Sequence, residues 1–281
     1  MTLSAGRPIL TASLFEELDD RLLALLEDLH FEDWQRPTVV PRWNVKQIAA
    51  HLLDTALRRL SLDRDRTPAA VHGPAPAAEG LTQLVNDMNA RGVAVYGALS
   101  ARVLVSLLRV ATRELREFFL TLDPMQPAAW SVSWAGEAQS LNWFDTAREF
   151  TERWHHQQQI RLAVARPGIM TPRLCGPVLE CFMRALPFAY RDLPSAIGTG
   201  VRIRIVGDCG GEWLLRRDAA HWQLVDPADH IDVIAATSIP QDLAWQVFTK
   251  AVAPAVARPF VSIDGDERLG AAVLQMITIV G

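Results

Sequence analysis

Leucine recurs at helical spacing near the start of this chain, and the same period governs most of the first 165 residues. One stripe is formed by Leu14, Leu18, Leu22, Leu25 and Leu29. Similar apolar stripes cover residues 45–60, 81–99, 103–122 and 142–166. Segments that contain Pro or Gly interrupt the pattern before residue 45, between 60 and 81, and between 122 and 142. Ser13 and Glu16 predict a capping box at the first helix. Four or five amphipathic helices with short connections favour an up-and-down bundle.

The pattern changes after about residue 200, where apolar and charged residues begin to alternate. VRIRIVG, EWLLRR and HWQLVD are typical of strands, DCGG of a turn, and together they predict an antiparallel meander. A predicted helix begins at Pro240, and PFVSIDGD adds a strand and a turn. We therefore expect a two-domain α+β protein. Residues 1–170 would form the helical bundle, and residues 171–281 a linker helix plus a small α+β domain with an antiparallel sheet.

Composition excludes several classes of function. The 281 residues carry a formal charge of −4 and contain no run of Lys or Arg, which argues against nucleic acid as a partner. No signal peptide or long uncharged apolar segment is recognisable, so we expect a cytoplasmic protein without membrane association. The three cysteines fit neither a disulfide framework nor a CxxC metal site. GxGxxG, GxxxxGK[ST], HExxH and GxSxG motifs are all missing from the sequence.

The segment EFTERWHHQQQIR, residues 149–161, carries the most distinctive chemistry. Glu152 and His156 are four residues apart, so on a helix they point about 40° from each other and can bind one ion. His155 could compete for that role. The best third ligand is His51 in WNVKQIAAHLLD, because it borders an apolar stripe. Three protein ligands leave one coordination position open for water or substrate, as in catalytic metal sites.

A solvated helix face is the alternative interpretation of the same residues. Asp145, Glu149, Glu152, His156 and Gln159 share one side of the predicted helix. That side lies roughly opposite the apolar stripe that contains Trp143 and Trp154. Polar pairs at i, i+4 are common on exposed helices, and a lone histidine is often structural. Periodicity alone therefore leaves both interpretations open.

WNVKQIAAHLLD and ERWHHQQQI resemble the two signatures of the DinB-like bundle superfamily. These are a Trp-initiated helix with one histidine and a later helix of the form H/E-x-x-H-H-x-x-Q. The resemblance implies an up-and-down four-helix bundle in which His51, Glu152 and His156 bind a divalent metal. Glutamate at the first motif position is similar to the branch typified by mycothiol-dependent maleylpyruvate isomerase. That branch also has a C-terminal α+β domain, similar in outline to VRIRIVGDCGGEWLL and VSIDGDERL here.

This resemblance implies a metal-dependent enzyme of thiol-transfer or thiol-assisted isomerisation type. Its partners would be a small-molecule substrate and a low-molecular-weight thiol such as mycothiol. Zinc is the default metal, with nickel as the other choice, because these ligand types do not discriminate between them. Arg268 matches the place of a C-terminal arginine that serves an anionic substrate in the isomerase branch, and so becomes a candidate catalytic residue.

Three further expectations stay open at this stage. Asp54 is a candidate acceptor for an imidazole N–H, with an ordinary surface aspartate as the alternative. Gln159 matches the end of the family pattern as a residue type only, with an ordinary bundle hydrogen bond as the alternative. Exposed aromatic faces on a bundle favour a homodimer. The competing function is a non-enzymatic protein that contains a metal or binds an apolar ligand, with a sterol-carrier-like C-terminal domain.

Overall fold

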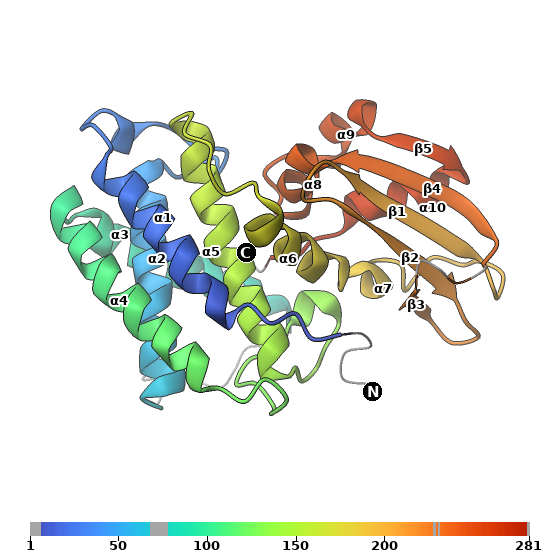
Figure 1. The fold of residues 1–281 in the computed structure, drawn as a ribbon, viewed down its shortest axis with the longest axis horizontal. Helices are drawn as coiled ribbons and strands as arrows, with labels where there is room; N and C mark the ends of the chain where they lie inside the picture. Colours follow the sequence, from blue (N-terminus) through green and yellow to red (C-terminus); the bar gives the residue numbers. More distant parts are fainter. Residues whose placement is uncertain (1–6, 68–77, 227–228, 230, 280–281) are drawn as a thin grey trace. The chain divides into compact units, whose positions relative to one another are not determined.

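A computed structural model describes residues 7–67, 78–226, 229 and 231–279 of this chain (Figure 1). They divide into two compact units, which are described separately. The helical unit comprises Leu10–Asp123 and Glu152–Ile169, and the sheet unit comprises the chain up to Ile9, Pro124–Thr151 and Met170–Ile279. As independently folding domains, residues 1–170 and 171–281 stay a prediction.

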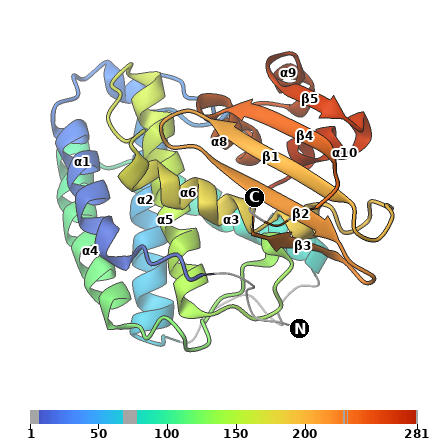
Figure 2. The same cartoon turned by 45° about the vertical axis from the view of Figure 1, so that its right-hand side comes forward.

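Long helices form the helical unit, and α1, α2, α4 and α5 lie side by side in Figures 1 and 2. The helices are α1 (Phe15–Glu27), α2 (Val45–Arg59), α3 (Ala78–Gly97), α4 (Ala101–Thr121) and α5 (Asn142–Ala163), the last of which begins in the sheet unit. Short helical turns precede α1 and follow α2, namely Ala12–Leu14 and Leu60–Arg64. None of the helices in the described ranges combines the length and apolar character that a membrane span needs.

The helix starts differ from the sequence prediction in an informative way. The capping box predicted at Ser13 and Glu16 is wrong: the chain enters α1 through a 3-10 turn without a side-chain cap. A capping residue needs extended backbone, whereas Leu14, the residue before α1, has helical dihedrals of φ −91° and ψ −16°. The capping box lies instead at α2, where Asn44 and Gln47 each accept the other's backbone N–H at 2.9 Å.

The sheet unit contains five strands within its described residues, in the order β3-β2-β1-β4-β5. They are β1 (Gly200–Val206), β2 (Gly211–Arg217), β3 (Trp222–Val225), β4 (Val233–Pro240) and β5 (Ser262–Gly265). The helices of this unit are α6 (Pro172–Met183), α7 (Leu186–Ala189), α8 (Gln241–Phe248), α9 (Pro254–Ala257) and α10 (Glu267–Ala271). α8 and α10 pack on strands of the sheet, which places its core between strands and helices.

The sheet is mixed, which corrects the antiparallel sheet predicted from the sequence. Strand β1 pairs antiparallel with β2, but its other neighbour, β4, runs parallel to it. After β3 the chain crosses to the far side of β1 before β4 begins. Alternation of apolar residues determines which face a side chain occupies, and it carries no information about the direction of the neighbouring strand.

Candidate metal centre

His51 is held on α2 by the helix start that precedes it. The capping box at Asn44 fixes where α2 begins, and His51 follows two turns later on the buried side, with 5% of its surface exposed. Trp43, immediately before the cap, lies against this imidazole with ring centroids 4.8 Å apart. The sequence motif marked Trp43 only as the start of a helix.

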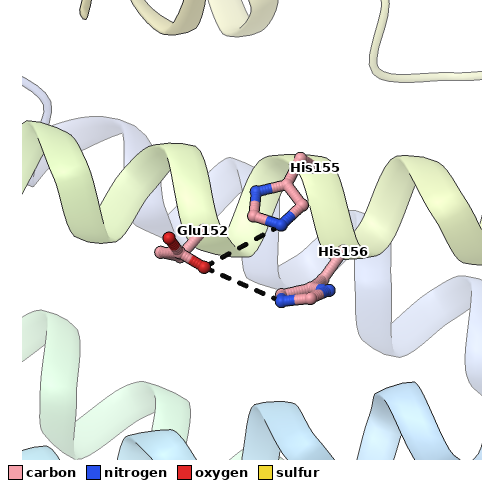
Figure 3. A group of neighbouring side chains, drawn as sticks. All are labelled: Glu152, His155 and His156. Carbon is pink, nitrogen blue, oxygen red and sulfur yellow. Dashed lines mark ion pairs between the residues drawn. The ribbon is translucent and has the colours of Figure 1, made fainter. Parts of the chain in front are cut away.

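Glu152, His155 and His156 form a second group of potential ligands, here called the α5 cluster (Figure 3). One ligand atom from each lies within 4.8 Å of the other two. Glu152 Oε2 is 3.8 Å from His155 Nε2 and 3.7 Å from His156 Nε2. Both histidines are buried and Glu152 is half-buried. The interpretation of these residues as a solvated face is therefore wrong.

The structure brings His51 and His156 together across α2 and α5. Their ring centroids are 4.7 Å apart and the rings meet edge to face at 74°. His155 also lies beside His156, at 4.1 Å between centroids, and it belongs to the compact ligand group whereas His51 does not. Two ligand sets share Glu152 and His156, with either His51 or His155 as the third member. The set named from the sequence stays a prediction.

Burial keeps the imidazoles of His51 and His156 neutral. Desolvation holds the pKa of His51 well below its ordinary value, and positive charge on His156, Arg58 or His155 would lower it further. The pKa of His156 falls to about 3, mainly through burial and His155, although Glu152 and Gln159 act in the opposite direction. Neutral imidazoles carry the lone pairs that metal ions require, so both histidines are available as ligands at neutral pH.

Gln159 orients the His156 ring. Its Oε1 lies 2.8 Å from His156 Nδ1, and because an amide oxygen only accepts, this contact is a hydrogen bond in the tautomer that carries the ring proton on Nδ1. The lone pair is then on Nε2, the nitrogen on the Glu152 side. The sequence marked Gln159 only as a residue type that matches the end of the family pattern, and the structure gives it a direct contact with His156.

The ligand group fits a divalent ion. Two ligand atoms each about 2.0–2.1 Å from a tetrahedral metal are about 3.3 Å apart, so the observed 3.7 and 3.8 Å separations need only a small contraction. In addition, His51 Nδ1 is buried and has no hydrogen-bond partner among the described residues. A buried nitrogen of this kind is stabilised by a ligand or a water molecule. Nitrogen and carboxylate donors suit zinc and nickel equally.

Asp54 is buried, which excludes the surface aspartate considered from the sequence. It lies one turn after His51 and forms a 2.8 Å ion pair with Arg58, whose guanidinium also donates to Asn89 on α3 at 2.7 Å. Burial raises the pKa of Asp54, and Arg58 opposes that shift. Gly92 permits this approach, because a Cβ there would stand 2.1 Å from the Asp54 carboxyl carbon. Asp54 is therefore engaged with Arg58 and α3.

Arg268 belongs to the sheet unit, whereas the histidine pair and the α5 cluster belong to the helical unit. It is exposed on α10 and donates to the Pro194 carbonyl at 2.9 Å. Its neighbour Glu267 pairs with Arg258. A catalytic role for Arg268 stays a prediction.

Comparison with known proteins gives two findings. A family model described as mycothiol maleylpyruvate isomerase N-terminal domain matches residues 15–161. A crystal structure of the mycothiol-dependent maleylpyruvate isomerase has 11% sequence identity and a TM-score of 0.51, with 95% of this chain and 97% of that chain covered. A mutant of that enzyme gives 10% identity, a TM-score of 0.55 and the same coverage. These likenesses confirm the α+β fold class, and no curated protein matches the chain.

Proposed function

Because this chain belongs to the mycothiol maleylpyruvate isomerase N-terminal domain family, we propose that it is a metal-dependent enzyme that activates a low-molecular-weight thiol. Mycothiol is the first candidate, since the family and the similar solved structures carry that name. The reaction would be thiol transfer or thiol-assisted isomerisation of a small electrophilic molecule. The observation that carries the proposal is the meeting of neutral His51 and His156 with Glu152 in a buried setting.

In this proposal His51, Glu152 and His156 hold the ion. A bound divalent cation lowers the pKa of a thiol close to it, so that the nucleophile exists at neutral pH. The two neutral imidazoles add no positive charge, and the single carboxylate leaves a net positive site that favours an anionic sulfur. Trp43 shields the imidazoles from water on one side, at 4.8 Å from His51 and 6.3 Å from His156.

Single-ligand variants decide between the two ligand sets. We expect purified protein to contain about one metal ion per chain, and His51→Ala, Glu152→Gln and His156→Ala to lose it, since each removes one of three ligands. His155→Ala is the matched control and should keep its metal. Metal retained in His51→Ala but lost in His155→Ala would replace the first set with the compact α5 cluster. Metal unchanged in all four variants would remove the site altogether.

Thiol activation needs its own test. Cobalt-substituted protein is titrated with mycothiol, bacillithiol, glutathione and coenzyme A, and a sulfur-to-cobalt charge-transfer band should appear with at least one of them. His156→Ala treated with cobalt is the control and should show no band. If no thiol perturbs the cobalt spectrum of the wild-type protein, the thiol function is wrong.

The apolar-carrier alternative finds less support in the sheet unit. A carrier of this type needs an apolar cavity there. Bulky side chains instead occupy its core, and those that are fully buried include Phe182, Tyr190, Trp222, Trp245 and Phe248. A cavity of about 250 Å³ is lined by residues of the helical unit, mainly from α1 and α4. The expected homodimer stays a prediction, for which sedimentation is the measurement.

A further inference from the structure

Three consecutive glutamines on α5 have different surroundings. Gln157 is buried against α1, Gln158 is half-buried, and Gln159 is 2% exposed beside His156. Among the hydrogen bonds of the described residues, the one to an imidazole from this run is made by Gln159, at 2.8 Å to His156 Nδ1. The position in the run, and not the residue type, therefore determines which glutamine touches the metal centre.

The consequence for His156 is chemical. A neutral imidazole carries one proton, and the amide oxygen at Nδ1 forms a hydrogen bond only with the tautomer that has its proton there. Nε2 is then left with its lone pair, 3.7 Å from Glu152 Oε2. In metal sites the second ring nitrogen commonly donates to such an outer acceptor, which fixes the tautomer and the ring orientation of the ligand.

His51 provides an internal contrast. Its Nδ1 is buried without a hydrogen-bond partner in the described part of the chain, so no contact of this kind selects its tautomer. Of the two facing imidazoles, His156 is the one whose ring nitrogen Nδ1 is hydrogen-bonded among the described residues. A ligand fixed in this way loses less conformational freedom on binding, which strengthens the affinity for the ion.

We propose that Gln159 is a positioning residue that holds His156 as its Nδ1–H tautomer and presents Nε2 to the metal. This inference rests on the proposed function to the extent that it requires His156 to be a metal ligand. Gln159 acts through His156 and has no assigned contact with substrate or thiol.

The test compares Gln159→Met, Gln159→Glu and Gln158→Met. Methionine keeps a similar length but removes the acceptor, glutamate keeps an acceptor oxygen, and Gln158→Met changes the neighbouring side chain, which has no bond to His156. Nitrogen-15 NMR of metal-free protein should show an Nδ1–H tautomer for His156 in the wild type, Gln159→Glu and Gln158→Met. Gln159→Met should show a mixture of the two tautomers.

Zinc affinity, measured by competition with a chelator, is the second readout. Gln159→Met should bind zinc about 10–100-fold more weakly, as expected for loss of an outer acceptor. Gln159→Glu and Gln158→Met should stay close to the wild type. An unchanged tautomer in Gln159→Met, or an equal loss of affinity in Gln158→Met, would overturn the inference.

The remaining outcomes separate this inference from the proposed function. If Gln159→Met does not fold, an Nε2–H tautomer for His156 in the wild-type protein would overturn the inference without it. Zinc binding that depends on Gln159 while no thiol binds would contradict only the thiol function. Normal zinc affinity in His156→Ala would contradict both, because His156 would then not be a ligand.

Discussion

Two polar stripes run along the part of α5 that belongs to the helical unit, and they have opposite characters. The paired stripe, Arg153, Gln157 and Arg161, faces α1 and is bonded to it at every position. Arg153 meets Asp19 at 3.0 Å, the Gln157 amide, oriented by its partners, donates to the Leu18 carbonyl at 3.0 Å, and Arg161 donates to the Arg21 carbonyl at 2.9 Å.

The site stripe, Glu152, His156 and Gln159, lies next to it on the same helix, and its His156 meets His51 of α2. Within the site stripe, Glu152 Oε2 lies 3.7 Å from His156 Nε2, and Gln159 Oε1 lies 2.8 Å from His156 Nδ1. Both stripes are largely buried, so burial does not separate them. The difference lies in what each stripe contacts: the paired stripe is bonded to α1 and stabilises helix packing, whereas the site stripe combines a carboxylate with a neutral imidazole, a donor set that suits an ion.

Removing one member of the paired stripe should have the largest effect. Arg153→Met should lower the free energy of unfolding by about 3–5 kcal/mol, because it leaves the buried Asp19 carboxylate without its partner. Urea denaturation measures this change. Zinc affinity should remain close to the wild type, since the stripe faces α1.

An exposed ion pair in the same unit is the control for Arg153. Arg166 and Asp28 are 2.8 Å apart but half-exposed or more, so Arg166→Met should cost less than about 1 kcal/mol. Equal losses for the two variants would contradict the distinction between buried and exposed pairing. A loss of zinc affinity in Arg153→Met would contradict the separation of the two stripes.

Acid should destabilise the metal-free protein through the site stripe. The folded state keeps His156 neutral, with a pKa of about 3, while the unfolded chain takes up a proton below about pH 6.5. Stability from this residue is therefore present above pH 6.5 and is lost as the pH falls, by about 2 kcal/mol between pH 7 and 5. His51 adds to this loss, because its pKa is also lowered.

Urea denaturation at pH 7 and pH 5, with a chelator present, measures the acid effect. His156→Gln should show a smaller loss of stability between these two pH values than the wild type. An identical pH dependence in the two proteins would mean that His156 is already protonated in the folded state at pH 5.

Substituting the glutamine of each stripe should affect different properties: stability for Gln157 and zinc affinity for Gln159. Gln157→Met should cost about 1–3 kcal/mol of stability, because the Arg161 and Leu18 groups that it bonds stay buried and lose a partner. Its zinc affinity should not change. Chelator competition and urea denaturation on Gln157→Met and Gln159→Met should give opposite patterns. Equal losses of zinc affinity would show that the two stripes act as one network.

The smallest expected effect concerns α2, which carries the other half of the histidine pair. Asn44→Ala should cost about 1 kcal/mol of stability through loss of the cap, and it should also weaken zinc binding, because His51 depends on the start of α2. Ser100→Ala is the matched control. Ser100 caps α4, so its loss should lower thermal stability without changing the affinity for zinc.

The sequence predicted which residues share a side of α5 better than it predicted what that side contacts. The 3.6-residue period placed Glu152, His156 and Gln159 on one side, and the structure confirms that they share it. Periodicity cannot say what that side faces, because a partner helix and water leave the same pattern on one helix. The paired stripe was not predicted, since its partners on α1 are separated from it by over a hundred residues in the sequence.

Local motifs were also insufficient for caps and strand directions. Ser13 and Glu16 have the residue types of a capping box, but the preceding 3-10 turn removes the extended backbone that a cap needs. Asn44 and Gln47 make the real box with less common residue types. The parallel pairing of β1 and β4 depends on a crossover, which strand alternation does not encode.

The Asn44 cap has a consequence beyond the stability of α2. Successive side chains on an α-helix are rotated by about 100°, so moving the start of the helix by one residue would turn every later side chain by about 100°. Because the Asn44 and Gln47 cap fixes the residue at which α2 begins, it determines that the side chain of His51 points toward His156. Two hydrogen bonds between side chains and backbone N–H groups at the start of a helix thereby determine the direction of an imidazole two turns away.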